Sequence, residues 1–261
     1  MTKAEELFRS GDLDACLQEL QNEIRKNPAD SRLRIFLAQL LMVNGQWERA
    51  GTQLSVIAEM DSQAIPMAHA YRAAIQCELL RVDVFAGKRS PLVFGDPEPW
   101  IAPLLQALAL TAGGHHEKAA ELRGTALEAA PAVAGTINGK PFEWLADADS
   151  RIGPMFEVLL NGAYYWVPAH RVKHIAFEAP ADVRDFVWLP ATFTWANEGE
   201  AMGLMPVRYS GTENSADPKL RLGRATSWSE AAGDTYLGLG QRVLTTDADE
   251  TGLLEVREIE F

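Results

Sequence analysis

The sequence predicts two domains of different fold class, an all-α array of helical hairpins over residues 1–133 and an α+β domain with a mainly antiparallel sheet over residues 134–261. Three observations support this prediction. A spacing of 34 residues recurs in the first half, the helical period of apolar residues stops near Gly135, and short strand-like segments follow. The chain has 261 residues, 47% of them hydrophobic, which is enough for two packed cores.

The 34-residue repeat consists of a turn glycine, two apolar positions and a small residue. It occurs in two copies and in a third, diverged copy two periods later: Gly11, Leu13, Cys16 and Leu20; Gly45, Trp47, Ala50 and Leu54; Gly114, His116, Ala119 and Arg123. Pro28 and Pro131 each follow the turn glycine of their copy by 17 residues. This pattern is typical of tetratricopeptide-like hairpins, which stack into a curved surface that binds other polypeptides. It therefore favours a binding protein over an enzyme.

The individual helices follow from capping and turn signals. Thr2 and Glu5 form a capping box that opens the first helix, which ends at Gly11. Further helices are expected at 12–26, from an N-cap at Ser31 to 43, at 47–60 and at 66–85. The irregular segment 88–99 holds three prolines and cannot be helical throughout, and another hairpin is expected over 100–130.

The second half reads mainly as strands. Asn161-Gly162, a strong hairpin signal, separates strands expected at 157–160 and 163–167. Other strands are expected at 192–195, 204–209, 236–244 and 253–261, and short helices at 141–149 and 180–186. The strands are too close in sequence for helical crossovers, so the sheet should be mainly antiparallel.

The composition limits the classes of partner. A formal net charge of −12 argues against a nucleic-acid partner and an anionic membrane surface, because both attract clustered Lys and Arg. The N-terminus lacks the features of a secretion signal, and the best apolar stretch, 35–43, is too short to span a membrane. Cys16 and Cys77 lie far apart and are expected as buried thiols. We expect a cytoplasmic protein that does not insert into membranes.

One group of residues suggests catalysis. Asp147 and Asp149 lie two residues apart, which places them on different faces of a helix, and no calcium-loop pattern follows. A role in capping a turn or in pairing with Arg151 is therefore favoured. An enzyme of unknown substrate that uses Asp147, Asp149, Arg151 and Glu157 is the alternative.

The other candidate motifs are weaker. His170 and His174 have a helical zinc spacing, but Pro168 and the aromatic residues before it favour strand or loop. Gly238 and Gly240 form half of a phosphate-binding loop, without the lysine and the following helix that such a loop needs. We therefore expect no catalytic residue, no cofactor and no metal.

Seven tryptophans are spread along the chain. Trp47 and Trp144 lie in helical patterns and are expected in the core, and Trp100 follows the proline-rich segment that it could anchor. The others belong to the β-rich half: Trp166, Trp188, Trp195 and Trp228. Core packing is the simpler interpretation of these four, and a partly exposed aromatic cleft for a partner is the alternative.

Seven segments spread over nearly the whole chain form a specific set of motifs. They are Phe94–Trp100, Asp147–Pro154 with Glu157, Gly162–Pro168, Arg184–Pro190, Pro206–Tyr209, Arg224–Trp228 and Gly238–Arg242. In this set the sequence resembles the ImpE family, also called TagJ or SciE-type, whose members are accessory proteins of bacterial type VI secretion systems. Ser227, where the family pattern has an acidic residue, is a small departure.

The resemblance implies a non-catalytic protein that binds the N-terminal helix of the small subunit of the secretion sheath and assists sheath assembly or recycling. Candidate partner-binding or family-motif residues are Trp100, Trp144, Asp147, Asp149, Arg151, Glu157, Trp166, Arg184, Asp185, Trp188, Arg208, Tyr209, Arg224, Trp228 and Arg242. The sequence does not decide which domain forms the partner groove; the clustering of these residues favours the C-terminal domain over the helical array. A general peptide-binding chaperone or scaffold of the tetratricopeptide type is the second alternative.

Overall fold

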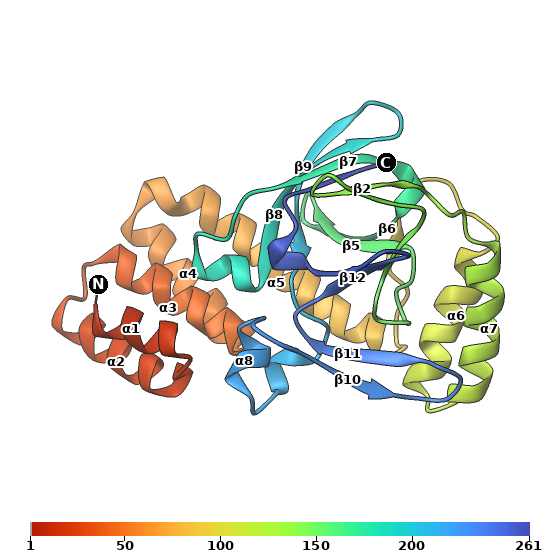
Figure 1. The fold of residues 1–261 in the computed structure, drawn as a ribbon. Helices are drawn as coiled ribbons and strands as arrows, with labels where there is room; N and C mark the ends of the chain where they lie inside the picture. The colour runs from red at the N-terminus through yellow and green to blue at the C-terminus, as the bar shows by residue number, and fades with distance from the viewer. Residues whose placement is uncertain (1) are drawn as a thin grey trace.

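The computed structural model describes residues 2–261, and its first half is the predicted array of helical hairpins (Figure 1). The array consists of α1 (Lys3–Ser10), α2 (Leu13–Lys26), α3 (Ser31–Val43), α4 (Trp47–Met60), the 3-10 turn η1 (Ser62–Ala64) and α5 (Ile65–Phe85). A separate hairpin of α6 (Ile101–Ala112) and α7 (His116–Ala129) stands at the other end of the molecule, on the right of Figure 1. None of the described helices is both long and apolar enough to cross a membrane.

Local chemistry fixes the helix ends. The predicted capping box is present, since the Thr2 hydroxyl accepts from the backbone N–H of Glu5 at 3.2 Å and the Glu5 carboxylate accepts from the N–H of Thr2 at 2.8 Å. The prediction of Ser31 as an N-cap is wrong, because Asp30 precedes it in an extended conformation and accepts from the N–H of Arg32 at 3.0 Å. The repeat glycine at position 11 has φ +86°, a left-handed turn that closes the first helix.

The main sheet has nine strands and is antiparallel apart from one pair. Its strands, in spatial order, are β1 (Leu92–Val93), β6 (Ala163–Pro168), β5 (Met155–Leu160), β9 (Glu200–Pro206), β8 (Trp188–Trp195), β7 (Val172–Phe177), β14 (Glu258–Glu260), β2 (Gly135–Ile137) and β3 (Lys140–Phe142). The exception is β1, which comes from the proline-rich segment and pairs parallel with β6. The proline-rich segment 88–99, which connects α5 to α6, thus adds an edge strand to the main sheet.

Two smaller sheets complete the strand-rich half. One contains β13 (Glu250–Gly252), β12 (Val243–Thr246) and β4 (Leu145–Asp147), and the other is a ribbon of β10 (Thr226–Glu230) and β11 (Tyr236–Gly240). In Figure 1 the ribbon runs along the bottom of the molecule, from the short helix α8 (Pro218–Arg221) towards α7. The 3-10 turns of this half are η2 (Ala169–Arg171), η3 (Val183–Phe186), η4 (Thr212–Asn214) and η5 (Leu253–Glu255).

The Asn-Gly hairpin between β5 and β6 is confirmed, with φ +50° at Asn161 and +77° at Gly162. The helix expected over 141–149 is wrong, because this stretch forms β3 and β4, which pair with β2 and β12. The single strand expected over 236–244 is divided in two at Gln241-Arg242. The end expected as one strand, 253–261, contains η5 and only the short strand β14.

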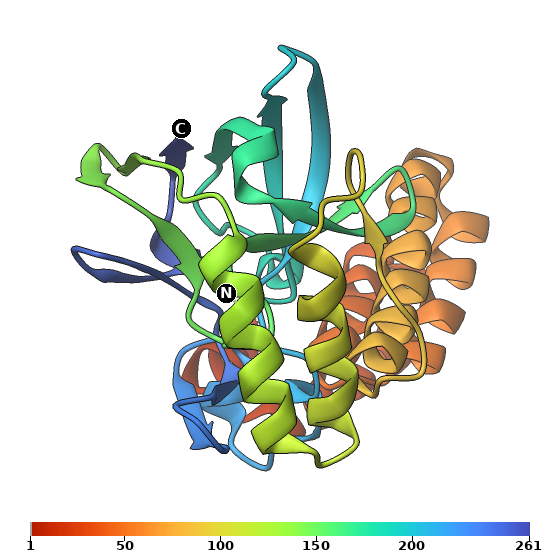
Figure 2. The ribbon, with the colours of Figure 1, turned by 90° about the vertical axis from the view of Figure 1, so that its right-hand side faces the viewer.

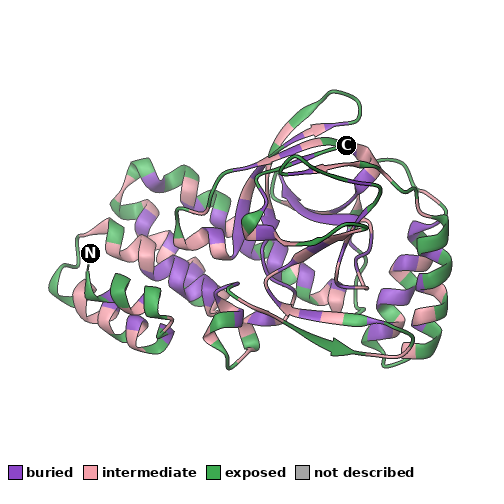
Figure 3. Cartoon of the chain, in the orientation of Figure 1, coloured by how far each residue is buried: buried purple, intermediate pink, exposed green. Residues whose placement is uncertain are grey.

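The main sheet separates two hydrophobic clusters. One of them continues into the helical array and includes Trp166 and Trp188, whereas the adjacent Val167 and Leu189 point into the cluster on the other face. Helix α3 is buried around its whole circumference from Leu37 to Val43 (Figure 3), because α2, α4 and η3 all contact it. The helical and strand-rich halves therefore share one core.

Candidate functional site

Helix α5 brings an ion pair into the interface with the sheet. The Arg81 guanidinium donates to the Glu157 carboxylate through Nε at 2.6 Å and through Nη2 at 3.0 Å. Arg81 also donates to the Glu78 carboxylate at 3.3 Å and to the carbonyl of Arg208 at 2.7 Å. Arg81 and Glu157 are almost completely shielded from solvent, so this bidentate pair joins the two halves without access to water.

Arg242 extends the pair into a network. Its guanidinium donates to Asp147 at 2.6 Å, to the Glu157 carboxylate, and through Nε to the carbonyl of Pro206 at 3.1 Å. The hydroxyl of Tyr209 donates to the other oxygen of Asp147 at 2.9 Å, and that of Tyr164 donates to Glu157. Every charged group of this network has a charged or hydrogen-bonding partner.

A third carboxylate of the motif region, that of Asp149, stabilises a turn. Asp149 is fully buried and accepts from the backbone N–H of Arg151 at 2.9 Å and from its Nε at 2.8 Å. It also accepts from the N–H of Gly238 at 2.8 Å, which ties the turn to β11. The predicted pairing of Asp149 with Arg151 is confirmed.

The C-terminal half occupies the inner face of the helical array. Trp188 stacks on Trp47 with ring centroids 6.0 Å apart, and its indole N–H donates to Glu78 at 2.8 Å. Arg208 donates to the carbonyl of Val43 at 2.7 Å and so caps the C-terminus of α3. The motif Arg184–Pro190 therefore packs against α3, α4 and α5 of the array.

Burial and neighbouring charges shift the pKa values of the two network carboxylates, Glu157 and Asp147, in opposite directions. Burial raises the pKa of Glu157, but the charges of Arg81 and Arg242 outweigh it and lower the pKa to about 2. Burial raises the pKa of Asp147 to about 6, with a further contribution from the charge of Asp149, and Arg242 only partly offsets it. Shifted carboxylates often mark active sites, but here their oxygens are bonded to the surrounding protein.

Four hollows of the described chain are lined by residues other than Asp147, Asp149 and Glu157. An enzyme that used these carboxylates would need a pocket that joins at least two of them, and none of these four hollows does so. Such a network is better explained as a structural connection between the two halves.

The predicted site residues differ in accessibility. Ten are buried: Trp100, Asp147, Asp149, Glu157, Trp166, Asp185, Trp188, Arg208, Tyr209 and Arg242. Arg151 and Arg184 are half-buried, and Trp144, Arg224 and Trp228 are exposed. The expectation that Trp144 packs in the core is wrong, since Trp144 is 40% exposed and lies in the connection between β3 and β4. Trp166 and Trp188, both fully buried, are inaccessible to a partner.

The sequence did not single out Glu78 and Arg81, although both belong to the network. The available signal was an oppositely charged pair three positions apart on the alanine-rich helix α5. Charged residues on a helix are usually solvated, so the signal is weak without the structure.

Glu98 anchors the proline-rich segment through hydrogen bonds of its carboxylate. The carboxylate of Glu98 accepts from the indole N–H of Trp100 at 2.9 Å and from Arg171 at 2.7 Å, and it lies 2.7 Å from Nε2 of His170. Although partial burial raises the pKa of Glu98, these hydrogen bonds lower it below its ordinary value near 4.5. The proposed anchoring role of Trp100 thus depends on Glu98.

We expect Glu98→Gln to lower the free energy of unfolding by about 1–2 kcal/mol at pH 7, because charge-assisted hydrogen bonds are lost. The folded-state pKa of Glu98 is lowered, so its contribution is complete above pH 4.5 and is lost as the pH falls towards the folded-state pKa. Urea unfolding should therefore show a difference in the free energy of unfolding between the unchanged protein and Glu98→Gln that is smaller at pH 3 than at pH 7. Glu198→Gln, in an exposed ion pair with Lys173, is the control and should change stability by less than about 0.5 kcal/mol. If this difference were the same at pH 3 as at pH 7, the stabilising role of the ionised Glu98 carboxylate would be contradicted.

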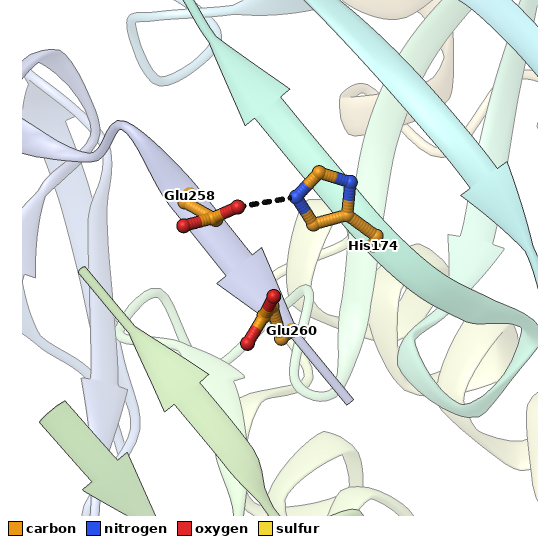
Figure 4. Close-up of side chains that lie close together, drawn as sticks. All are labelled: His174, Glu258 and Glu260. Carbon is orange, nitrogen blue, oxygen red and sulfur yellow. Dashed lines mark hydrogen bonds and ion pairs between the residues drawn. The ribbon is translucent and has the colours of Figure 1, made fainter. Parts of the chain in front are cut away.

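The two candidate zinc histidines do not meet. His170 pairs with Glu98, whereas His174 on β7 pairs with Glu258 on β14 at 2.8 Å (Figure 4). Glu260 completes a group of three possible ligands whose atoms lie within 4.8 Å of one another. Both glutamates are exposed, and no fourth His, Cys, Asp or Glu joins them among residues 2–261. A surface His–Glu pair accounts for this geometry.

Two of the four hollows are grooves on the helical array. The first, about 660 Å³, lies between α1, α3 and η3, where the rings of Phe36 and Phe186 pack 6.0 Å and 5.9 Å from that of Phe8. One of its walls is the chain's own segment 181–183 with Phe186, and Gln39 donates to Asp182 across it at 2.9 Å. The second, about 600 Å³, lies between α4 and α5.

Comparisons with known proteins agree with this architecture. Residues 139–260 match the family described as ImpE protein, and residues 7–75 match a tetratricopeptide repeat. The chain is 52% identical over 258 residues to the type VI secretion system accessory component TagJ of Pseudomonas aeruginosa, covering 99% of this chain and 90% of the relative. The crystal structure of protein VPA1032 from Vibrio parahaemolyticus superposes with a TM-score of 0.89 at 25% identity, covering 99% of this chain and 97% of that one.

Proposed function

Because the chain belongs to the ImpE family, we propose that it is a non-catalytic accessory protein of a type VI secretion system that acts in the cytoplasm by binding another protein. The observation that carries this proposal is the 52% identity to an accessory component along 99% of the chain. The structure supports it in two ways. The array is of a peptide-binding type, and the motif carboxylates Asp147, Asp149 and Glu157 are buried and bonded to neighbouring groups.

The proposed partner is the N-terminal helix of the small sheath subunit, and the proposed role is to assist sheath assembly or recycling. An amphipathic helix can dock in a groove with its apolar residues at i, i+3, i+4 and i+7 facing inwards. The net charge of −12 favours a helix that carries Lys and Arg on its polar face, since opposite charge accelerates encounter.

The alternative of a general peptide-binding scaffold receives less support. That alternative requires an open inner face on the helical array, but η3 and Trp188 of the C-terminal half occupy this face. Arg208 closes it further by capping α3. A long extended peptide therefore has no continuous inner surface on which to lie.

A fluorescence anisotropy titration tests the proposal. A labelled peptide of the small sheath subunit's N-terminal segment, from the same bacterium, should bind with a Kd below about 100 μM, equivalent to roughly −5.5 kcal/mol. Affinity should fall as salt is raised, because the charge on the protein contributes to association. A scrambled peptide of the same composition is the control. The absence of binding at about 100 μM, or equal binding of the scrambled peptide, would contradict the proposed function.

A further inference from the structure

The helical array lacks one helix of its repeat. Helix α1 is followed by α2, and α3 by α4, so α5 is the first helix of a third hairpin. After α5 the chain turns at Gly87, with φ +70°, and enters the proline-rich segment instead of a second helix. The next helix of the described chain, α6, starts at Ile101 and pairs with α7 (Figure 2). The position beside α4 and α5 is thus not filled by a helix that follows α5.

The groove between α4 and α5 lies at this position. It has a volume of about 600 Å³ and is lined by Trp47, Glu48, Gly51, Thr52 and Ser55 of α4 and by Arg72, Ala73, Ile75, Gln76 and Leu79 of α5. Gly51 leaves its floor open, because a Cβ atom there would meet nothing within 4 Å. Small residues on a helix surface allow another helix to approach closely.

An apolar stripe runs along the α5 side of the groove. Ile75, Leu79 and Val82 are spaced at i, i+4 and i+7; Ile75 is buried in the core, whereas Leu79 and Val82 are 46% and 39% exposed. This spacing places them in a row on one face of the helix, which matches the contact surface that one helix offers to another. Leu79, which lines the groove, and Val82, one turn beyond it, thus form an unpartnered apolar surface on α5.

We propose that this groove is the docking site for an amphipathic α-helix of the partner, which takes the place of the missing second helix. The inference rests on the proposed function. It places the partner groove in the helical array, whereas the sequence favoured the C-terminal domain. The chain's own second helices describe the occupant. In α4 the buried residues are Ala50, Leu54 and Ile57, and α2 buries Cys16 and Leu20 with the same spacing. The docking helix should therefore present a small residue, a large aliphatic residue four positions later, and about four turns in total.

Charge complementarity sets the direction of the docked helix. Ser55 contacts Arg72, so Glu48, two turns before Ser55, lies beside the C-terminal part of α5. A helix antiparallel to α5 would place its positive N-terminal end at Glu48 and its negative C-terminal end at Arg72. The second helix of each preceding hairpin runs in this direction, and basic residues in the first turns of the partner helix would strengthen the contact.

Two substitutions in the groove and one outside it test the location, with the labelled sheath-subunit peptide as the probe. Gly51→Leu fills the floor with a better helix former, and Leu79→Asp places a charge in the apolar stripe. Leu127→Asp, at a 40% exposed leucine on α7, is the matched control. We expect the two groove variants to bind at least about 30-fold more weakly, and the control to bind within about twofold of the unchanged protein. Far-ultraviolet circular dichroism and thermal melts verify that all three variants are folded.

The outcomes distinguish the two proposals. If the unchanged protein does not bind the peptide, the proposed function fails. If it binds and the folded groove variants bind equally well, the function stands and the docking site lies elsewhere. If the control variant loses affinity as much as the groove variants, the effect is not specific to the groove, and this location is overturned.

Discussion

Replacing Glu157 with glutamine is expected to lower the free energy of unfolding by about 3–5 kcal/mol at neutral pH, because the change leaves buried charges uncompensated. Glu157 neutralises two buried cations, Arg81 and Arg242, and a neutral amide cannot do so. Each guanidinium would then remain in the core with less than its required counter-charge. Urea unfolding should show the loss directly, and the melting temperature should fall by roughly 2–4 °C per kcal/mol.

The pH dependence of this effect has a definite sign. The pKa of Glu157 is lowered from 4.5 to about 2 in the folded protein, so its stabilising contribution is complete above pH 4.5 and is lost as the pH falls towards 2. The stability difference between the protein and Glu157→Gln should narrow over that range. Glu230→Gln, at an exposed position on β10, serves as the control and should change stability by less than about 0.5 kcal/mol. A loss below about 1 kcal/mol for Glu157→Gln would mean that the network does not connect the two halves.

Replacing Trp188 with alanine is expected to cost about 3–5 kcal/mol as well. The side chain is fully buried, stacks on Trp47 of α4, and lies with its ring centroid 6.5 Å from that of Tyr71 on α5. Its removal leaves a cavity between the array and the sheet and takes the indole N–H from Glu78. Urea unfolding gives the magnitude, and near-ultraviolet circular dichroism reports the loss of fixed aromatic packing.

Two further variants separate the contributions of Trp188. Trp188→Phe keeps an aromatic ring in the core but removes the hydrogen bond to Glu78 and part of the buried ring, so it should cost about 1–3 kcal/mol, less than Trp188→Ala. Trp228→Ala, at a tryptophan that is 39% exposed, should cost less than Trp188→Ala because less area returns to water. Equal losses for Trp188→Ala and Trp228→Ala would refute the assignment of Trp188 as the central contact between the halves.

The helical part of the fold could be predicted because its signals are local. A turn glycine, a capping carboxylate or hydroxyl and a period of 3.6 residues are all contained within one hairpin, so α1 begins after its capping Thr2 and ends before Gly11, as the sequence predicted. The hairpin of β5 and β6 was predictable for the same reason, since Asn161-Gly162 fixes its own turn.

The strands that were missed or displaced depend on distant partners. The segment 140–147 becomes β3 and β4 through pairing with β2 and with β12, which lies far along the chain. Strand β10 has polar and exposed residues on both faces, so no apolar alternation marks it in the sequence. Tertiary pairing decided these elements, and no short window of sequence contains that information.

The sequence identified part of the buried network but not its role. The family motifs identified Asp147, Glu157 and Arg242, yet nothing in the sequence indicated that three charged side chains lie in a core. Their burial follows from pairing across the two halves, and one of the partners, Arg81, lies 76 residues before Glu157. The groove between α4 and α5 had no signal of its own, because it results from the absence of a helix.

The parallel strand β1 has a consequence for the evolution of this protein. Leu92 and Val93 belong to the helical half in sequence but pair with Tyr165 and Trp166 in space. A recombination event that exchanged one half for an unrelated domain would remove an edge strand and separate Arg81 from its carboxylate. We therefore expect the two halves to be inherited together, with substitutions on one side of their boundary constraining those permitted on the other.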